Sequence, residues 1–471
     1  MFTIFKKKKN YQTIIRMFLM KYLNKTVSLT FISTLFLVTL FTRSFVGIEF
    51  GSIRLGEVIV FGSLMWSFIL IIFYQKLNIE NYFEKKLLFA FVFTIFTFFI
   101  LSIISKSNLV SPYTYKTSSY IWTFSILLFS IWLFNTFNFN QKYFIIFLPM
   151  PFVMYLFSTG NYPDFIINFF KEYSDKFNFL KASDIMLATI GSNIFARNLI
   201  RNKNIQIFFF LISSSLILPL LLFMSRGSFV ALLIFVFFEI FYEKNYFKLN
   251  KLKSFFIFIS SALVFLLSLV YVDYLYVNEE TKTLQYNEIF VAPGSLISDS
   301  VNELALKNDT RKVFLSFYIH YGRLESRDPT TNWRLDIWQD IIFDMAEDSK
   351  LVNAYGYKEI LPQMTDPTAP GRLGRDGLNE NVHSYFVNIL ARGGLLQLFA
   401  FFYLYIGIIR KWKSDNGNYR IVGFILPVLF CASLDIAMEG VQFPVNFFVL
   451  LGYIIFFENL NTNKDEVKVY N

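Results

Sequence analysis

The stretch SFFIFISSALVFLLSLVYVD, residues 254–273, holds a single charge, Asp273 at its end. An α-helix of about 20 residues is about 30 Å long, which is the thickness of the hydrocarbon core of a bilayer. Lys251 and Lys253 precede the stretch, as is typical of a span that begins at the cytoplasmic face. This run therefore predicts a transmembrane helix.

Runs of this kind recur along the 471-residue chain, which is 55% hydrophobic and 20% aromatic. A soluble domain does not sustain such repeats, so we predict an all-α integral membrane protein with about 12 spans. The expected spans are 26–48, 56–75, 87–105, 119–137, 142–160, 183–200, 205–224, 227–242, 254–273, 393–410, 420–436 and 443–458. The sixth is the most polar, because Asp184, Asn193 and Arg197 interrupt it. A polar span usually faces protein or water, not lipid.

The net charge of +10 comes from Lys and Arg in short segments between the predicted spans, which argues against a nucleic-acid surface. With the N-terminus inside, the cytoplasmic segments hold 24 Lys and Arg, against 7 in the short outer segments. This bias predicts that both termini are cytoplasmic. The single cysteine, Cys431, lies in an apolar run, which excludes a disulfide within one chain and favours core packing.

The same orientation places residues 274–392 outside the membrane, as one long loop between the ninth and tenth spans. The loop is mildly acidic, with 17 Asp and Glu against 12 Lys and Arg. A connection of this length is usually functional or a small domain. We therefore divide the chain into a nine-span bundle (1–273), the outer loop (274–392), and three last spans with a cytoplasmic tail (393–471).

Part of the loop has a helical pattern. We expect a helix from Asn332 to about Met345, capped by Thr331. Its apolar stripe is Trp333, Ile337, Ile341 and Met345. The segment 362–379 is rich in Pro, Gly and Asp, which predicts a surface loop.

Three basic residues share the predicted outer face: Arg226 at the start of the eighth span, Arg334 in the loop, and His383 before the tenth span. Each alone has an ordinary explanation. Arg226 is as well explained by anchoring its span at the membrane interface as by a functional role. Arg334 fits an ion-paired helix residue near Asp336 and Asp340, and His383 fits a loop residue at a helix start.

Together, the three residues suggest transfer of a glycan from a polyprenyl diphosphate. Departure of the diphosphate builds negative charge, which arginine stabilises through bidentate contacts. A histidine near its ordinary pKa can take the proton of an incoming sugar hydroxyl. Outer carboxylates, among them Asp435 and Glu439, could orient the basic groups or bind acceptor hydroxyls. The sequence has no Asp-x-Asp motif and no cysteine pair, so we expect no metal and no cofactor.

At these residues the chain resembles the O-antigen ligase and polymerase superfamily of bacterial surface polysaccharide assembly. The segments, in the family's order, are SRGSFVAL at 225–232, RLDIW at 334–338 with AYGY at 354–357, and His383-Ser384, then nine intervening residues, then Gly394. Gln397 occupies the last position of the third pattern, where the family has Gly, Thr or Tyr. The resemblance covers about residues 205–410 and the twelve-span plan.

The resemblance implies a metal-independent membrane glycosyltransferase of the GT-C type that uses an undecaprenyl-diphosphate-linked glycan. It implies catalytic roles for His383, Arg226 and Arg334. The positions that we expect to bind substrate are Ser225, Gly227, Trp338, Tyr357, Asn381 and Gly394. The expected location is the bacterial inner membrane, with the active site facing the periplasm.

The function that we expect is an O-antigen ligase, which transfers the glycan to an acceptor sugar of the lipid A core in lipopolysaccharide biosynthesis. The first alternative is an O-antigen polymerase that joins lipid-linked repeat units. Further alternatives are a protein O-oligosaccharyltransferase and a transporter of the glycan lipid. The expected partners are the lipid-linked glycan, an acceptor glycolipid or lipid-linked repeat, and membrane lipids, without nucleic acid.

Overall fold

The computed structural model of the chain describes residues 2–51, 53–137, 139–175, 180–278, 316–357 and 382–458. The helices are α1 Phe2–Val46, α2 Leu55–Ile72, α3 Lys85–Ile104, α4 Pro112–Thr117, α5 Ser119–Thr136, α6 Met150–Ser158, α7 Asp164–Tyr173, α8 Ala182–Leu199, α9 Lys203–Met224, α10 Arg226–Tyr242, α11 Lys244–Leu249, α12 Lys251–Asn278, α14 Pro329–Glu347, α15 Lys350–Asn353, α16 Tyr385–Asn416, α17 Val422–Leu434 and α18 Gln442–Tyr453. Short helical turns are η1 Ile79–Asn81, η2 Gln141–Phe147, η4 Ala437–Glu439 and η5 Ile454–Glu458.

Two small antiparallel hairpins accompany the helices: β1 Glu49–Phe50 with β2 Ile53–Arg54, and β3 Phe317–His320 with β4 Arg323–Ser326. Each of the twelve predicted spans contains a helix of the structure. Among the described residues, eight helices are long and apolar enough to cross a membrane, and Val422–Leu434 and Gln442–Glu458 are shorter apolar helices. The prediction of an all-α membrane protein is confirmed, whereas the number of spans stays a prediction.

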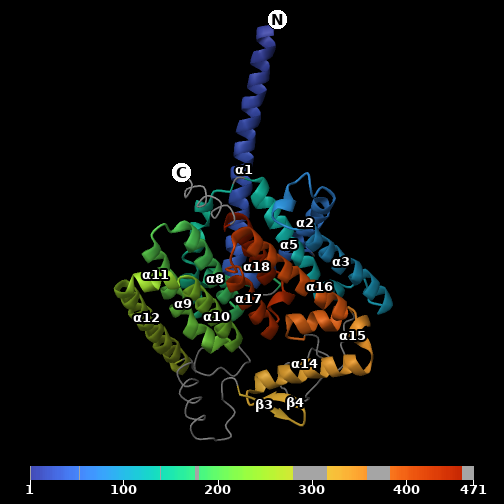
Figure 1. Ribbon diagram of the computed structural model, residues 1–471, viewed down its shortest axis with the longest axis vertical. Coiled ribbons are helices and arrows are strands. Elements are labelled where there is room, and N and C mark those ends of the chain that lie inside the picture. Colours follow the sequence, from blue (N-terminus) through green and yellow to red (C-terminus); the bar gives the residue numbers. More distant parts are fainter. Residues whose placement is uncertain are drawn as a thin grey trace.

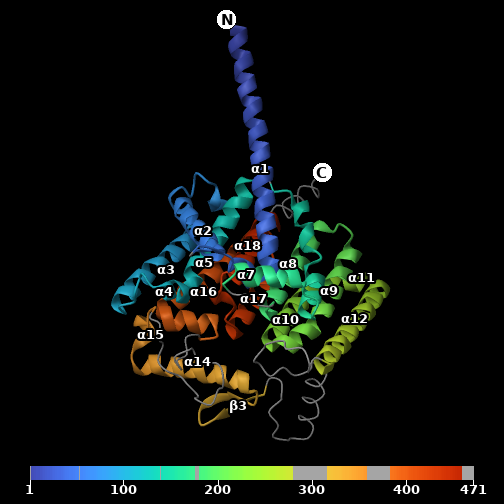
Figure 2. The same cartoon turned by 180° about the vertical axis from the view of Figure 1, so that it is seen from behind.

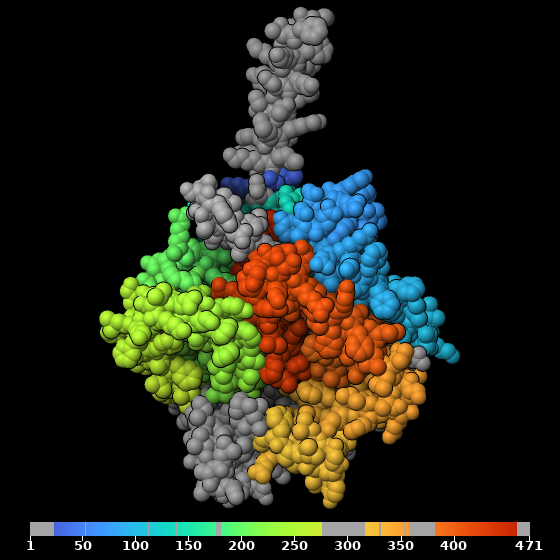
Figure 3. Space-filling model, viewed as in Figure 1, coloured from blue at the N-terminus to red at the C-terminus, as the bar shows by residue number. Residues whose placement is uncertain are grey.

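The helices form one bundle with two distinct ends (Figure 1). The first turns of α1 project from one end, and α14 with the β3–β4 hairpin covers the other, which we call the cap end. In the space-filling view, α16, α17 and α18 lie between α10 and α12 on one side and α2 and α3 on the other (Figure 3). From behind, α7 lies beside the last turns of α1 (Figure 2), where the Phe41 and Phe170 rings are 5.1 Å apart.

The most polar predicted span, α8, lies inside the protein. Every residue from Ala182 to Ala196 is buried. Two of its polar groups bond to other parts of the protein: Ser192 Oγ donates to the carbonyl of Leu148 at 3.1 Å, and Asn193 Oδ1 accepts from Ser213 Oγ at 3.2 Å. The prediction that this span faces protein is confirmed.

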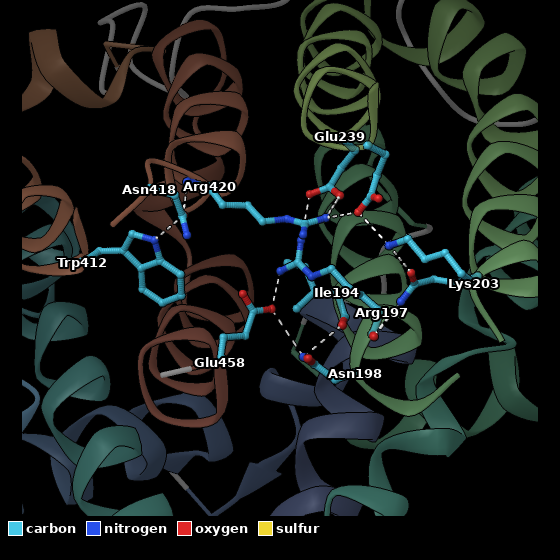
Figure 4. A network of polar contacts seen from close by, with 11 residues as sticks. Ile194, Arg197, Asn198, Lys203, Glu239, Trp412, Asn418, Arg420 and Glu458 are labelled. Atoms are coloured by element: carbon cyan, nitrogen blue, oxygen red, sulfur yellow. Dashed lines mark hydrogen bonds and ion pairs between the residues drawn. The ribbon is translucent and has the colours of Figure 1, made fainter. Parts of the chain in front are cut away.

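Six charged side chains form a network at the end opposite the cap, which we call the network end (Figure 4). They are Arg197, Lys203, Arg420, Glu239, Glu243 and Glu458. Glu239 accepts from Arg197 at 2.8 Å and from Arg420 at 2.6 Å. Glu243 accepts from Arg420 at 2.9 Å and from Lys203 at 2.8 Å. Charges buried in a bundle must be paired in this way, because an unpaired one carries a large desolvation cost.

This network joins the ends of α8, α10 and η5 to the starts of α9 and α17. The positive-inside pattern places these five helix ends on the same side of the membrane. The relative directions of the five helices therefore agree with the sequence. Which side of the membrane holds the network stays a prediction.

The helix predicted in the outer loop is present, but its cap is different. α14 begins at Pro329, and Asp328 is its N-cap, because Asp328 Oδ2 accepts from both the backbone N–H and the hydroxyl of Thr331, at 2.9 and 2.6 Å. The prediction of a Thr331 cap is wrong: a carboxylate three residues earlier takes the amide and the hydroxyl. The predicted stripe from Trp333 to Met345 is buried against Val382 and α16.

The ends of the predicted loop differ from the structure. α12 continues to Asn278, and α16 begins at Tyr385, so both helices extend into residues 274–392. The surface loop predicted at 362–379 lies outside the described residues. The three-part division of the chain stays a prediction.

α16 is broken at Gly394, where the helix changes direction below the cap. The φ of Gly394 is +70°, and a Cβ at this position would lie 2.6 Å from the carbonyl oxygen of Val352 in α15. Only glycine takes this conformation freely and lets the α15 backbone come so close.

We expect Gly394→Ala to destabilise the protein more than Gly417→Ala. Gly417, which ends α16, also has a positive φ (+67°), but its Cβ would meet nothing within 4 Å. Gly417→Ala should therefore cost only the left-handed strain, about 1–2 kcal/mol. Gly394→Ala should add a steric clash and lower the Tm further in detergent. Equal Tm values for the two variants would contradict this account of the break.

Candidate functional site

Arg226 is the first residue of α10 and reaches the cap. Its Nη1 lies 3.1 Å from Asp328 Oδ1, so the ion pair links the start of α10 to the start of α14. Ser225 precedes it as the N-cap, with Oγ accepting from the Ser228 N–H at 3.5 Å. A Cβ on Gly227 would lie 3.3 Å from Leu434, so the start of α10 packs closely against the end of α17.

Arg334 lies in the second turn of α14 and is half-buried. Its Nε is buried and donates to no acceptor in the described chain. None of the carboxylates that the structure describes lies within ion-pair distance of Arg334; its electrostatic partners are Asp435 and Cys431. A half-buried guanidinium with no carboxylate at ion-pair distance is well suited to bind an anion that is not part of the protein.

His383 stands at the entrance of α16, in an unusual backbone conformation. Its φ is +55°, and Ser384 follows as the N-cap. Non-glycine residues in this region are uncommon and cluster at functional sites. The His383 ring packs edge-on against Trp333 of α14, with centroids 4.8 Å apart.

Trp338 holds the backbone next to His383. Its Nε1 donates to the carbonyl of Val382 at 2.8 Å, and Val382 is fully buried. The indole therefore ties α14 to the residue that precedes His383. This contact gives Trp338 a positioning role, while its predicted contact with substrate stays a prediction.

Asp435, just after the end of α17, connects the two basic residues of the cap. It interacts electrostatically with Arg334 and His383, and also with Lys181 at the start of α8. Its Oδ1 accepts from the N–H of Ile436 at 2.8 Å. Arg334 and His383 thus face one carboxylate, and Arg226 pairs with the capping residue of the helix that carries Arg334. The structure brings the three predicted catalytic residues to the cap end of the bundle.

Glu439, in η4, extends the site on its acidic side. Burial raises the pKa of Glu439 to about 7, although Arg392 and Lys116 act to lower it. Lys181 interacts with both Glu439 and Asp435. The site therefore has a basic half, formed by Arg226, Arg334 and His383, and an acidic half around Lys181. The carboxylates near that lysine are Asp184, Asp435 and Glu439.

Two of the predicted substrate-binding residues are used inside the protein. The hydroxyl of Tyr357 is fully buried and donates to Gln397 Oε1 at 3.0 Å, and Tyr120 donates to the same oxygen at 2.6 Å. Gln397 Nε2 donates in turn to Thr97 Oγ1 at 3.0 Å. Gly394 forms the break in α16. The assignment of Tyr357 and Gly394 to substrate stays a prediction, and Asn381 lies outside the described residues.

Gly356, the glycine of the AYGY motif, lets the loop pack closely against the end of α3. Gly356 has a φ of +74°, and a Cβ there would lie 2.1 Å from Ser105 Oγ at the end of α3. The carbonyl of Gly356 also accepts from the buried Arg392 of α16 at 3.4 Å. This part of the motif joins α3, the loop and α16 to one another.

Sequence reasoning missed Lys181, Asp184 and Arg392 as members or neighbours of the site. Lys181 is visible in the sequence as one of the few outer lysines, and Asp184 as a charge inside a predicted span. Their convergence depends on how α8 packs against α17 and α18, which no local pattern encodes. Cys431, predicted to pack in the core, is 1% exposed and contacts Ser228 Oγ at 3.5 Å. Among the described residues no group of three or more His, Cys, Asp or Glu could hold a metal ion.

Comparison with known families yields one match. Residues 208–402 match the family model described as O-antigen ligase. This region runs from α9 to α16 and contains Arg226, Arg334 and His383. No curated protein and no solved structure matches the chain.

We expect Trp338→Phe to lower activity in addition to stability. The substitution keeps an aromatic ring but leaves the buried Val382 carbonyl without its donor, at a cost of about 1–3 kcal/mol. Trp412→Phe is the matched control, because Trp412 Nε1 donates to Asn418 Oδ1 at 3.1 Å, outside the site. Tm in detergent and glycan transfer in cells should be measured for both. A Trp338→Phe protein with full transfer activity would show that this hydrogen bond does not position His383.

Proposed function

We propose that this chain, a member of the O-antigen ligase and polymerase superfamily through residues 208–402, transfers an undecaprenyl-diphosphate-linked glycan to a sugar of the lipid A core. The family consists of glycosyltransferase-like ligases and polymerases that act on lipid-linked glycans.

The observation that carries the proposal is the guanidinium of Arg334. It is held by α14 at the cap end, with no carboxylate within ion-pair distance among the described side chains, and Arg226, the first residue of α10, pairs with Asp328 at the start of α14. A diphosphate leaving group needs two or more permanently charged donors as its negative charge grows. Arg334 would bind it directly, because none of the described carboxylates lies within ion-pair distance of its guanidinium. Arg226 would exchange Asp328 for a phosphate oxygen, since an ion pair that is 26% and 14% exposed can open.

His383 supplies the general base. Packing against Trp333 and the bond from Trp338 to Val382 fix its ring and backbone, and Asp435 stabilises its protonated form. The acceptor hydroxyl oxygen forms a bond to the anomeric carbon of the donor as the bond from that carbon to the phosphate oxygen breaks. The electron pair leaves with undecaprenyl diphosphate, and the hydroxyl proton goes to His383.

The ligase and the polymerase differ in the acceptor that receives the glycan. In a polymerase, the incoming hydroxyl belongs to a second lipid-linked repeat unit, and the chemistry at Arg226, Arg334 and His383 is the same. Gln397, in the position where the family pattern has Gly, Thr or Tyr, is the observation that keeps the polymerase in consideration. The glycan profile of a deletion strain distinguishes the two.

Surface polysaccharide from a deletion strain should lack the O-chain entirely, with the glycan accumulating on the polyprenyl carrier. This is the ligase result, because polymerisation continues while attachment to the core stops. A single repeat unit left on the core would indicate the polymerase instead. Unchanged surface polysaccharide with a missing glycoprotein would indicate a protein oligosaccharyltransferase.

Arg226→Ala, Arg334→Ala and His383→Ala should each abolish transfer in the complemented deletion strain while membrane levels stay normal. The first two remove charges that face the leaving group, and the third removes the base. Arg323→Ala and His320→Ala are the matched controls, because Arg323 pairs with Asp340 and His320 with Glu325 on the hairpin face. Transfer and protein level are measured on the same membranes. Retained transfer in all three site variants would remove these residues from the mechanism.

The proposal also fixes the orientation: the cap end faces the periplasm of the inner membrane, and the network end faces the cytoplasm. The native Cys431 is buried, so an introduced cysteine reports its own side. Tyr321→Cys, at a hairpin position that is 93% exposed, should react with a membrane-impermeant maleimide in spheroplasts. Ser414→Cys, exposed near the other end of α16, should react only after permeabilisation. The reverse labelling pattern would invert the orientation.

A further inference from the structure

Asp184, in the first turn of α8, is a buried carboxylate that lacks a well-formed hydrogen bond. The residue is 3% exposed, and neither of its carboxylate oxygens accepts a hydrogen bond from the part of the chain that the structure describes. The side chain of Gln442 in α18 lies close enough to act as a weak donor to this carboxylate, but the contact lacks regular hydrogen-bond geometry. Burying an unsatisfied carboxylate is costly, and native proteins rarely do so without a functional reason.

The charges around Asp184 place it next to the proposed active site. It interacts electrostatically with Lys181 and Asp435, and with Arg43 at the end of α1. Asp435 interacts in turn with Arg334 and His383. Asp184 is therefore linked, through Asp435, to the residues that would bind the glycan donor and take the proton.

Glu439 shows the same feature on the other side of Lys181. Its Oε1 is buried and accepts no hydrogen bond from any described residue. Lys181 interacts with Glu439, Asp435 and Asp184. The acidic half of the site thus holds unused acceptors on two carboxylates, with an ammonium group near both.

We propose that Asp184 binds the acceptor sugar, whose hydroxyl groups donate to its carboxylate, with Glu439 and Lys181 completing the subsite. This inference rests on the proposed function and adds where the acceptor binds. Carboxylates accept strongly from sugar hydroxyls, and the ammonium of Lys181 donates to sugar oxygens.

The charge distribution decides which substrate occupies this half. The donor carries a diphosphate, which Arg226 and Arg334 would attract, whereas Asp435 would repel it, as would Asp184 and Glu439 whenever they are ionised. The reacting part of the acceptor is an uncharged sugar, for which a cluster of hydrogen-bond acceptors is suitable. His383 interacts with Asp435 between the two halves, which is where the acceptor hydroxyl must lose its proton.

The test uses the full-length protein in nanodiscs. The acceptor is lipopolysaccharide core from the deletion strain, and the donor is the polyprenyl-linked glycan that accumulates there. Asp184→Asn keeps the shape and removes the charge, and we expect the KM for the core to rise at least about tenfold with the KM for the donor unchanged. Asp164→Asn, an exposed carboxylate at the start of α7, is the matched control and should change neither KM.

A second variant separates binding from folding. Asp184→Leu removes a buried carboxylate whose oxygens lack well-formed hydrogen bonds, so its Tm should stay at or near that of the wild type while the KM for the core rises. A lower Tm with an unchanged KM would assign Asp184 a structural role and overturn the inference. A wild-type protein that transfers no glycan would overturn the proposed function, and this inference with it. A transferring wild type whose KM for the core is unchanged by Asp184→Asn overturns this inference alone.

Discussion

The pairing of buried charge at the network end fixes the arrangement on which the rest of the bundle depends. Glu239 binds two arginines, Arg197 and Arg420, and these come from segments more than two hundred residues apart in the chain. In a medium of low dielectric constant, such charges are tolerated only when they are paired, so the helices that carry them can meet in few ways. The network sets the relative directions of α8, α10 and α17. Their opposite ends, which carry Lys181, Arg226 and Asp435, then meet at the cap end without a continuous segment of sequence to join them.

The cap end combines rigid and strained parts. α14 is attached at both ends of its first three turns, through the ion pair of Asp328 with Arg226 and through the bond of Trp338 to Val382. His383 keeps a left-handed backbone conformation between these attachments. Such a conformation costs about 1–3 kcal/mol and persists only where the surroundings enforce it. The histidine ring is thus oriented before any substrate arrives, which reduces the reorganisation that the transfer step would need.

Helices and relative span directions were predictable because hydrophobic run length and the distribution of Lys and Arg are local properties. The polar span α8 gave the weakest signal for a physical reason: its surroundings are protein, so it needs little apolar surface. The cap of α14 was misassigned because Asp328 and Thr331 are both good caps, and only the geometry shows which one accepts the bond. Arg226, Arg334 and His383 were singled out by their shared outer face and by short motifs, and their catalytic roles stay a prediction. In the sequence, Asp184 is only a charged residue that interrupts a predicted span. Its lack of a well-formed hydrogen bond depends on how the helices pack, which the sequence does not reveal.

Gln397 restricts which substitutions its neighbours can accept. Its side chain accepts from the hydroxyls of Tyr120 and Tyr357 and donates to Thr97 and to the carbonyl of Thr94, so four helix or loop segments share one amide. A smaller residue at 397 would leave the two phenol groups only each other, at 3.1 Å, so that one of the two hydroxyl hydrogens would lose its acceptor in a closed interior. Substitutions at positions 120, 357 and 397 are therefore expected to occur together. In homologous chains these three columns should covary, and a homologue with threonine or glycine at this position should carry phenylalanine or another non-donor at the tyrosine positions.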